Sequence, residues 1–461
     1  MRTILVLGLA IALAGGAPSQ ERAAVWATDY NTAAHVTGID LQAPWSAGPL
    51  PGEPAYHDAV LRWHDGRVWV VNRAGADNVQ VLDPAQGFDT VAQYSLGLGR
   101  NIQDIGFAPD GTAYVSCYDT AELLHIDPED GTILDVISTA AFADQDGLPE
   151  TGWLRVHDGR VFVSCQRLDR DQWYAPVGDS YLLVLDVDTG SWIDADPGQP
   201  GTQGILLAAS DPYTPIAAAG DRLYVGCTGY YGVQDGGIDV IDPAALVSLG
   251  LEITESELGG DLVDLALTGE TRHVVVADPG WVTHVQRYAP GQAPVTLLSG
   301  TAYDHADIAW DGDFQLLVAD RRTSSPGVRV LDTVSGAELT TGPVSVGLPP
   351  AMIAIAAGEA PVGVHDAPGA ALAMSAPWPN PANPATSIRF GGPPGVTATV
   401  RVLDLRGRLV REVRVATDGD GRGAWVFDGR DQLGRAAASG VYRCVVETAG
   451  GYAARSFTIV R

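Results

Sequence analysis

Four aspartates begin short apolar runs at well-separated points of the chain: Asp58-Ala-Val-Leu, Asp104-Ile-Gly-Phe, Asp264-Leu-Ala-Leu and Asp307-Ile-Ala-Trp. Carboxylates gathered in one place either hold a hard cation such as Ca²⁺, which prefers oxygen ligands, or acquire raised pKa values. His57 directly precedes the first run and His305 lies two residues before Asp307, so both imidazoles are candidates for the same site. The alternative is structural, with each Asp bracing its own turn or hydrogen-bonding a neighbouring unit.

Aromatic residues gather in two longer polar segments, residues 167–179 and residues 228–235. The first contains Trp173 and Tyr174, and the second contains Tyr230 and Tyr231. Such rings can stack on a sugar or a peptide, because they combine an apolar face with a polar edge. They can equally pack down as the small core of their own loop, and the sequence leaves both interpretations open.

Other catalytic signatures are missing from the sequence. It has no Gly-rich phosphate loop after a strand, no Cys-x-x-Cys pair and no His-Glu-x-x-His helix. A lone Ser, His or Asp cannot be assigned to a triad from the sequence. The aspartate series and the aromatic segments are therefore the only candidate ligand sites.

The elements that position these residues come from a pair of strands that recurs about seven times in residues 24–357, with about 48 residues per repeat. The pairs are Ala24–Thr28 with Val36–Asp40, Arg67–Asn72 with Val79–Asp83, Ala113–Cys117 with Leu123–Asp127, Arg160–Cys165 with Leu182–Asp186, Arg222–Cys227 with Ile238–Asp242, His273–Asp278 with His284–Tyr288, and Phe314–Asp320 with Val328–Asp332. Each pair is flanked by one apolar run before it and one extended run after it, which predicts four antiparallel strands per repeat. Repeats of this kind predict a seven-bladed β-propeller over residues 23–357.

The ends of the repeat array predict how the propeller closes. The first repeat lacks a preceding inner strand, and the last is followed by an orphan apolar run, Ala351–Ala356. We expect this run to complete the first blade, because closure removes exposed strand edges. Inner strands begin where second strands end, so the aspartates and the aromatic segments are predicted to share one end of the channel. The aspartates that end the third strands are assigned to turns.

Charge and targeting signals indicate a protein outside the cytoplasm. The 461 residues carry 28 basic and 56 acidic side chains, a net charge of −28, and every fixed cation is Arg. So acidic a surface repels phosphate backbones, which argues against a nucleic-acid partner. Residues 1–22 have the positive start, apolar stretch and small residues of a secretory signal peptide, and no other segment resembles a transmembrane helix. Cys117, Cys165 and Cys227 occupy one place in successive repeats, which predicts buried, reduced thiols.

The composition changes after the propeller. Residues 358–375 are rich in Ala, Gly and Pro and are predicted to be a flexible linker. Residues 376–461 contain about seven short alternating strands, which predict a small β-sandwich. Asp428 and Asp431 are assigned there to a turn braced by their side chains.

Both parts resemble known families. The repeats, best seen in residues 110–127, resemble YVTN/YncE-like surface-layer propeller repeats. The C-terminal part resembles FlgD-like immunoglobulin modules, similar to the sorting domains of type IX secretion cargo. The phrases that carry this second resemblance are Pro379-Asn-Pro381, Val402-Leu-Asp-Leu-Arg-Gly-Arg408, Phe427-Asp-Gly-Arg-Asp431 and Ser439-Gly-Val-Tyr442. The second resemblance implies export through this module by secretion or cell-surface attachment machinery.

Together these features favour a secreted or surface-displayed, non-catalytic propeller that binds a glycan or peptide ligand or serves as a scaffold. The alternative is an extracellular lactonase- or lyase-like enzyme that uses a divalent cation in the propeller funnel. A funnel filled by Arg would favour the first hypothesis, and a bound metal would favour the second.

Overall fold

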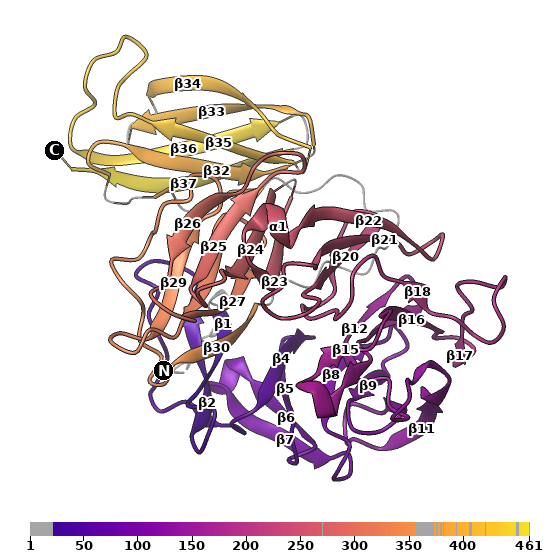
Figure 1. Cartoon of the computed structure of the whole chain (residues 1–461). Coiled ribbons are helices and arrows are strands. Elements are labelled where there is room, and N and C mark those ends of the chain that lie inside the picture. The colour runs from indigo at the N-terminus through magenta and orange to yellow at the C-terminus, as the bar shows by residue number, and fades with distance from the viewer. Residues whose placement is uncertain are drawn as a thin grey trace, which may run out of the picture. The chain divides into compact units, whose positions relative to one another are not determined.

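Seven small antiparallel sheets follow one another along the chain and form the blades of a β-propeller (Figure 1). The computed structural model describes residues 22–269, 271–355 and, between 373 and 460, all residues except 375–376, 379, 381, 393, 405–407, 420 and 449–450. The predicted signal peptide lies outside the described residues except for Arg22, which begins the first strand. The predicted linker also lies outside the described residues, except for residues 373–374. Pro379, Pro381 and Gly407 of the C-terminal part lie outside the described residues as well.

The first three blades have four strands each, ordered from the channel outwards. Blade 1 comprises β30 (Pro350–Ile355), β1 (Arg22–Thr28), β2 (Ala34–Asp40) and β3 (Glu53–Pro54). Blade 2 comprises β4 (Ala59–His64), β5 (Arg67–Asn72), β6 (Asn78–Asp83) and β7 (Asp89–Ser95). Blade 3 comprises β8 (Ile102–Phe107), β9 (Ala113–Cys117), β10 (Glu122–Ile126) and β11 (Ile133–Ser138).

The remaining blades vary at their outer edges. Blade 4 comprises β12 (Thr151–His157), β13 (Arg160–Cys165) and β16 (Tyr181–Asp186), with β17 (Ser191–Trp192) and β18 (Ile205–Leu206) both on β16. Blade 5 comprises β19 (Ala217–Ala219), β20 (Arg222–Cys227), β21 (Gly237–Asp242) and β22 (Val247–Thr254). Blade 6 comprises β23 (Asp261–Thr268), β24 (Thr271–Ala277), β25 (Thr283–Tyr288) and β26 (Val295–Ser299). Blade 7 comprises β27 (His305–Trp310), β28 (Gln315–Asp320) and β29 (Gly327–Asp332).

Short elements lie in the connections. A two-stranded hairpin, β14 (Leu168–Asp169) with β15 (Ala175–Pro176), follows β13. The described helices are short: η1 (Pro84–Gln86), η2 (Ala140–Phe142), η3 (Arg170–Gln172) and α1 (Glu255–Leu258). Within the described part of the chain, no helix has both the length and the apolar character needed to span a bilayer.

The predicted closure by both ends of the repeat array is confirmed. The late strand β30 pairs with the first strand β1, with Ala23 opposite Ile355 and Trp26 opposite Met352. Neighbouring inner strands then contact one another around the ring, as β27, β30, β4, β8 and β12 do in turn. Closure from two distant segments therefore leaves no open edge between the first and last blades.

Burial is high in the second strands and lowest in the outer strands, which explains the sequence pattern. The inner strands vary, and β12 and β27 are only partly buried. Every residue of the inner strand β23 is buried, and so are five of the six residues of the second strand β5. The outer strand β11 is almost wholly exposed. Strands covered on both faces by adjacent blades read as continuous apolar runs, whereas edge strands need not. The three propeller cysteines, at the ends of β9, β13 and β20, are buried and unbonded, as predicted.

The third-strand aspartates brace turns, as the sequence predicts. Asp83 accepts a hydrogen bond from the Ala85 backbone N–H at 2.8 Å, and Asp332 accepts one from the Ser335 N–H at 2.7 Å. A carboxylate that satisfies the backbone of its own turn is a local structural device.

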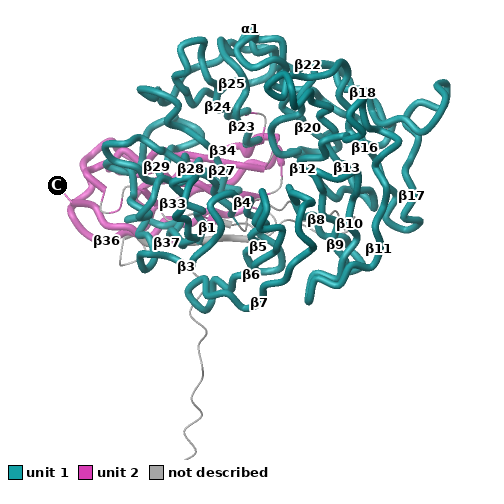
Figure 2. The backbone as a smooth tube through the Cα atoms, turned by 60° about the horizontal axis from the view of Figure 1, so that its bottom comes forward, with its two compact units in different colours: residues 1–268, 272–360 teal, residues 269–271, 361–461 magenta. Residues whose placement is uncertain are grey.

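Contacts along the chain separate a second unit, and the division falls between residues 360 and 361 (Figure 2). Its strands form two antiparallel sheets. One contains β31 (Ala373–Met374), β32 (Thr386–Gly391) and β35 (Arg422–Phe427), and the other contains β34 (Leu409–Ala416), β33 (Thr397–Asp404), β36 (Gly440–Thr448) and β37 (Gly451–Ile459). Phe390 and Phe427 of the first sheet share one core with Val400 and Phe457 of the second, so the unit is a β-sandwich.

The turn predicted around Asp428 and Asp431 is present in this unit. Asp428 accepts a hydrogen bond from the Arg430 N–H at 3.0 Å. Asp431 accepts one from the Leu433 N–H at 2.9 Å. Both aspartates therefore serve the fold locally.

Candidate functional site

Aspartates of the inner strands are aimed by β-bulges. In β8, Ile102 pairs with Cys117 but Ile105 pairs with Val115, so Gln103 and Asp104 together oppose one residue. The strand β27 shows the same irregularity between His305 and Ile308, which places Asp307 at the equivalent point. A bulge adds one residue and re-aims its side chain.

Three of these carboxylates hydrogen-bond the inner strand of the next blade. Asp104 accepts from the Leu154 N–H at 2.9 Å, and Asp264 accepts from the Ile308 N–H at 2.7 Å. Asp307 accepts from the Ile353 N–H at 2.9 Å. Asp104 and Asp264 also accept the N–H of the residue that follows each of them, at 2.8 Å. We call Asp104, Asp264 and Asp307 the latch aspartates, because each ties one blade to the next.

Blades 1 and 2 lack an Asp at this position. Met352 lies there in β30, and its Sδ lies 3.2 Å from the Leu61 nitrogen of the next blade. In blade 2 the residue before Leu61 is Val60, so Val60 is the counterpart of the latch aspartates. Asp58, which the sequence aligned with them, lies two residues earlier and pairs with Arg73, whose Nε is 2.9 Å from Asp58 Oδ1. The strand β4 pairs with β5 without a bulge, which explains the offset.

Arg62 supplies positive charge to the latch aspartates. Its Nη2 lies 2.7 Å from Asp104 Oδ2, and Asp104 is completely buried. Its guanidinium carbon also lies 5.0 Å from the centroid of the Trp153 ring. The positive charge of Arg62 acts to lower the pKa of Asp264 and of Asp307 as well. This guanidinium therefore relieves charge that a bound cation would otherwise have to neutralise.

Asp264 and Asp307 behave as one acid pair. Burial raises the pKa of Asp264 to about 6, against lowering by the Ile308 and Leu265 N–H groups. Burial and the nearby charge of Asp264 raise the pKa of Asp307 well above its ordinary value. The negative charge of Asp264 therefore disfavours ionisation of Asp307. Among the residues that the structure describes, no three His, Cys, Asp or Glu side chains gather closely enough to hold a metal ion.

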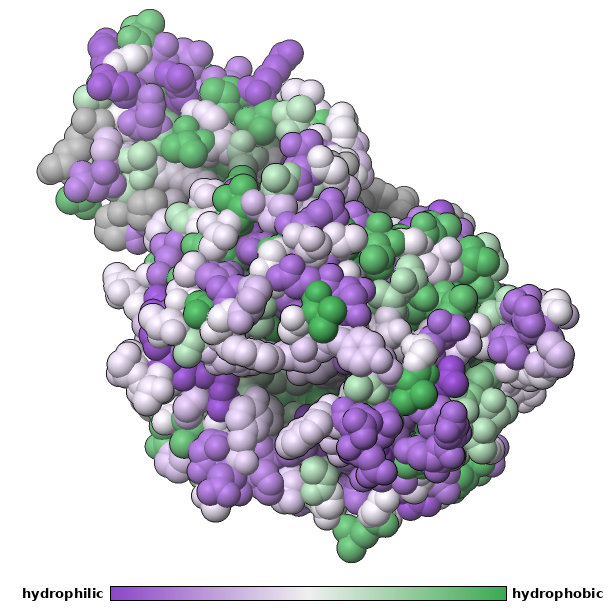
Figure 3. Space-filling model, viewed as in Figure 1, coloured by the Kyte–Doolittle hydropathy of each residue, from purple (hydrophilic) through white to green (hydrophobic). Residues whose placement is uncertain are grey.

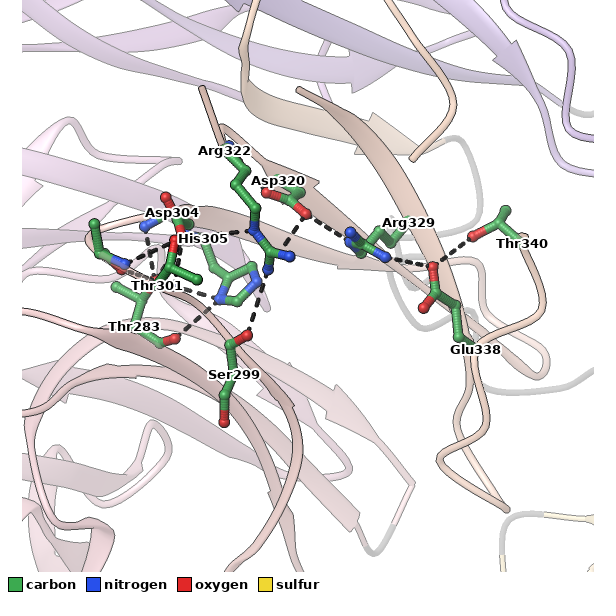
Figure 4. A network of polar contacts seen from close by, with 11 residues as sticks. Thr283, Ser299, Thr301, Asp304, His305, Asp320, Arg322, Arg329, Glu338 and Thr340 are labelled. Carbon is green, nitrogen blue, oxygen red and sulfur yellow. Dashed lines mark hydrogen bonds and ion pairs between the residues drawn. The ribbon is translucent and has the colours of Figure 1, made fainter. Parts of the chain in front are cut away.

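Neither candidate histidine joins this site. His305 is wholly buried, with Nδ1 3.1 Å from the Thr283 carbonyl oxygen, among the polar contacts of Asp304 and Arg322 (Figure 4). Burial lowers the pKa of His305, which keeps the imidazole neutral. The His57 ring packs against Tyr56, with ring centroids 4.1 Å apart.

A cavity of about 740 Å³ opens at the end of the channel where the inner strands begin. The propeller face in Figure 3 is hollowed near its centre, and the inner strands β4, β8, β12 and β30 lie around the same region in Figure 1. Ten aromatic side chains line this cavity: Trp26, Tyr30, Tyr118, Trp153, Trp173, Tyr174, Tyr213, Tyr230, Tyr231 and Tyr303. Asp264 and Asp307 also line it, whereas Asp58, Asp104, His57 and His305 do not.

The hairpin β14–β15 presents Trp173 and Tyr174, and Arg170 holds it in place. Arg170 Nε lies 2.9 Å from Glu150 Oε1, and its Nη1 lies 2.8 Å from Asp119 Oδ1 in the preceding blade. Trp173 is 97% exposed, and its φ of 57° is the left-handed conformation of a tight turn. The rings of this hairpin therefore face solvent at the cavity rim and form no core of their own.

The second aromatic segment is held by carboxylates. Asp235 accepts the Tyr230 N–H at 2.9 Å, and the buried Glu255 accepts the Gly236 N–H at 2.9 Å. The Tyr231 ring stacks on Trp281 at 5.4 Å, and its hydroxyl lies 2.7 Å from the Tyr303 hydroxyl. Tyr230 and Tyr231 remain 47% and 38% exposed. This segment is thus packed at its base and open at its edge.

Several lining residues outside the two long aromatic segments share a position relative to the strands, which could have identified them from the sequence. Tyr30 and Tyr118 follow the second strands β1 and β9, in the place where Tyr230 follows β20. Tyr213 and Tyr303 lie instead just before inner strands. A search for aromatic residues at both kinds of junction in every repeat finds these four residues.

One more acid faces the cavity. Asp211 is only 8% exposed, and its Oδ1 accepts a hydrogen bond from Gln166 Nε2 at 2.6 Å. Burial raises the pKa of Asp211 to about 7, against lowering by the Gln166 hydrogen bond. Nothing in the spacing of the repeats marks this residue, because it lies in the irregular connection before β19.

No family model and no curated protein matches this chain. The resemblances to YVTN/YncE-like repeats and to FlgD-like modules therefore stay predictions.

Solved structures give weak likenesses. PorZ, an essential surface component of the type IX secretion system of Porphyromonas gingivalis, has a TM-score of 0.48 and 14% identity, over 92% of this chain and 63% of PorZ. This chain thus spans less than two thirds of PorZ. The periplasmic gluconolactonase PpgL of Pseudomonas aeruginosa has a TM-score of 0.48 and 15% identity, over 72% of this chain and 98% of PpgL. A quinoprotein alcohol dehydrogenase-like protein of Bacteroides thetaiotaomicron has a TM-score of 0.46 and 11% identity, over 73% of this chain and 78% of that protein. At these TM-scores the likenesses support no inference about activity.

Proposed function

We propose that the protein is a secreted or surface-displayed, non-catalytic binding protein that holds its ligand in the aromatic cavity of the propeller. The observation that carries this proposal is the cavity itself, with ten aromatic side chains in about 740 Å³. Binding sites for small ligands are typically concave, largely apolar spaces of roughly 300–1,000 Å³ with a few polar groups.

The engagement of the latch aspartates supports binding over catalysis. Asp104 is tied to Arg62 and to two backbone N–H groups, and it does not line the cavity. Asp264 and Asp307 line it, but each also accepts a backbone N–H from the next blade. A general base needs a free lone pair within hydrogen-bond reach of the substrate proton. The main role of carboxylates that accept hydrogen bonds from the next blade is to stabilise the fold.

A binding screen with the full chain tests this function. Immobilised protein is exposed to arrays of glycans and peptides, and the ligands retained are titrated in solution against wild type and Tyr230→Ala. Tyr230 is an exposed lining residue, so its loss should weaken binding at least tenfold while the thermal melt stays unchanged. Retention of a ligand with equal affinity by both proteins would place the binding site elsewhere.

The alternative is a lactonase- or lyase-like enzyme, and it has one supporting observation. The Asp264–Asp307 pair lines the cavity, and burial raises the pKa of both carboxyl groups, which suits a general acid. If a divalent cation such as Ca²⁺ completed the site, the melting temperature would rise with added metal and fall with a chelator. Turnover of a lactone that is lost in Asp307→Asn would replace the binding proposal with this one.

We further propose that the C-terminal unit directs export or surface attachment through a dedicated machinery. The support is its sandwich fold together with the ordered phrases of its sequence, from Pro379-Asn-Pro381 to Ser439-Gly-Val-Tyr442. Deletion of residues 376–461 should leave a folded propeller inside the cell envelope, as measured by fractionation and protease accessibility. Unchanged surface display of the truncated chain would contradict this role.

A further inference from the structure

We infer that the ligand of the aromatic cavity is an uncharged saccharide. This inference rests on the proposed binding function and names the ligand class of that site. It follows from the charges, the hydroxyl groups and the strand edges around the cavity.

Cations of the chain already occupy faces of several lining rings. The Arg321 guanidinium carbon lies 4.2 Å from the centroid of the Tyr30 ring, and that of Arg170 lies 5.1 Å from the centroid of Tyr118. The Arg62 guanidinium lies over the Trp153 ring in the same way. At these three rings a positively charged ligand would meet faces that arginines already occupy.

An anionic ligand is disfavoured by the acids that line the cavity. Asp211, Asp264 and Asp307 all contribute to its surface. The Arg73 guanidinium also lines it, but it is paired with Asp58. A carboxylate or phosphate on the ligand would therefore face three acids and no unpaired lining cation among the described residues, whereas a neutral ligand meets no such repulsion.

Hydroxyl groups of the cavity suit a polyol. Tyr30 and Tyr213 both line the cavity, as Arg73 does. Neither hydroxyl has a hydrogen-bond partner among the residues that the structure describes. Asp211 also lines the cavity, and its Gln166 hydrogen bond engages Oδ1 rather than Oδ2. Phenol groups both donate and accept, and so do sugar hydroxyls.

Several backbone N–H groups of the inner strands are already engaged and are not available to bind a peptide. An extended peptide binds a sheet edge through free backbone N–H and C=O groups. In this propeller the N–H groups of Leu154, Ile308 and Ile353 are already bonded by the latch aspartates, and that of Leu61 lies against Met352 Sδ. Exposed rings such as Trp173 can instead stack on the apolar face of a pyranose ring.

The test is isothermal titration of the full-length protein with three sets of probes. These are neutral oligosaccharides (maltohexaose, cellohexaose, xylohexaose and chitohexaose), charged saccharides (oligogalacturonate and chitosan oligomers) and a set of extended peptides. We expect at least one neutral oligosaccharide to bind, with affinity reduced at least tenfold in Trp173→Ala and several-fold in Tyr213→Phe. Trp378→Ala is the matched control, because Trp378 is a partly exposed tryptophan of the sandwich, and it should bind as wild type does.

Three outcomes overturn the inference. Binding of only charged saccharides or only peptides contradicts the assignment of an uncharged saccharide, but it is consistent with the proposed binding function. Binding of a neutral saccharide that the Trp173 and Tyr213 variants do not weaken places the site elsewhere. No binding by any probe, together with lactone turnover, removes the binding function as well.

Discussion

The latch aspartates with Arg62, which we call the floor although Asp104 does not line the cavity, and the rim of the propeller cavity are built in opposite ways. At the floor, Asp104 is wholly buried against Arg62, and the latch aspartates use their oxygens to accept backbone N–H groups of the next blade. At the rim, Trp173 is almost fully exposed, and Arg170 ties its hairpin to Glu150. Polar groups at the floor stabilise the fold, whereas aromatic groups at the rim remain available to a ligand. Variants of the two regions should therefore separate stability from binding.

The largest effect is expected at the floor. Replacing Arg62 with Ala leaves Asp104 buried without its ion-pair partner, which costs about 3–5 kcal/mol of unfolding free energy in comparable sites. Urea denaturation measures this loss. Arg222→Ala is the control, because Arg222 forms only partly exposed ion pairs, with Asp221 and Asp242, and such pairs contribute about 0–1 kcal/mol. Equal losses in the two variants would contradict the assigned role of Arg62.

An intermediate effect is expected at Arg170. Arg170→Ala removes the charged partner of Glu150, whose side chain is wholly buried, and leaves Glu150 Oε1 without its hydrogen bond, which costs about 1–3 kcal/mol. Hydrogen exchange should then quicken in the hairpin β14–β15, and affinity for the cavity ligand should fall. A loss of global stability without faster exchange in residues 168–176 would show that Arg170 does not position the hairpin.

A smaller effect is expected from pH. Burial raises the pKa of Asp211 in the fold from 3.8 to about 7, so the folded state binds a proton that the unfolded chain releases. The associated stability is complete below the ordinary carboxyl pKa and is lost as pH rises through the folded pKa. The melting temperature should therefore fall between about pH 5 and pH 8, and it should fall less in Asp211→Asn.

The control for this pH series is Asp130→Asn. Thr132 hydrogen bonds lower the pKa of this exposed carboxyl, so it is ionised throughout the range. Its melting temperature should follow that of wild type. If the melting temperature of Asp211→Asn falls with pH as much as that of wild type, other acids cause the pH dependence.

The smallest effect on stability is expected at the rim. Trp173→Ala removes a side chain that is 97% exposed, and substitutions at such surface sites usually change stability by less than about 0.5 kcal/mol. The same variant should nevertheless lose affinity at least tenfold. Calorimetric melting beside titration measures both quantities. A large loss of stability would mean that the ring packs within its own loop.

The sequence predicts the propeller well because its signals are local and repeated. A strand buried on both faces needs an unbroken apolar run, as β5 shows, and the turns between strands need Asp and Gly. The missing inner strand of the first repeat likewise predicts the pairing of β30 with β1. The site is less predictable, because its members come from separate blades. Trp26 and Tyr303 approach the same space only after closure.

The aspartate series shows which features the sequence predicts and which depend on the tertiary structure. The sequence by itself determined that acids begin several inner strands and that aromatic segments share their end of the channel. Only the tertiary structure decided that bulges aim Asp104 and Asp307 at the next blade while Asp58 pairs with Arg73. It also decided that Arg62 neutralises the floor and that His305 is buried away from it. The physical reason is that a one-residue change of register redirects a side chain, and charge balance depends on groups that are far apart in the sequence.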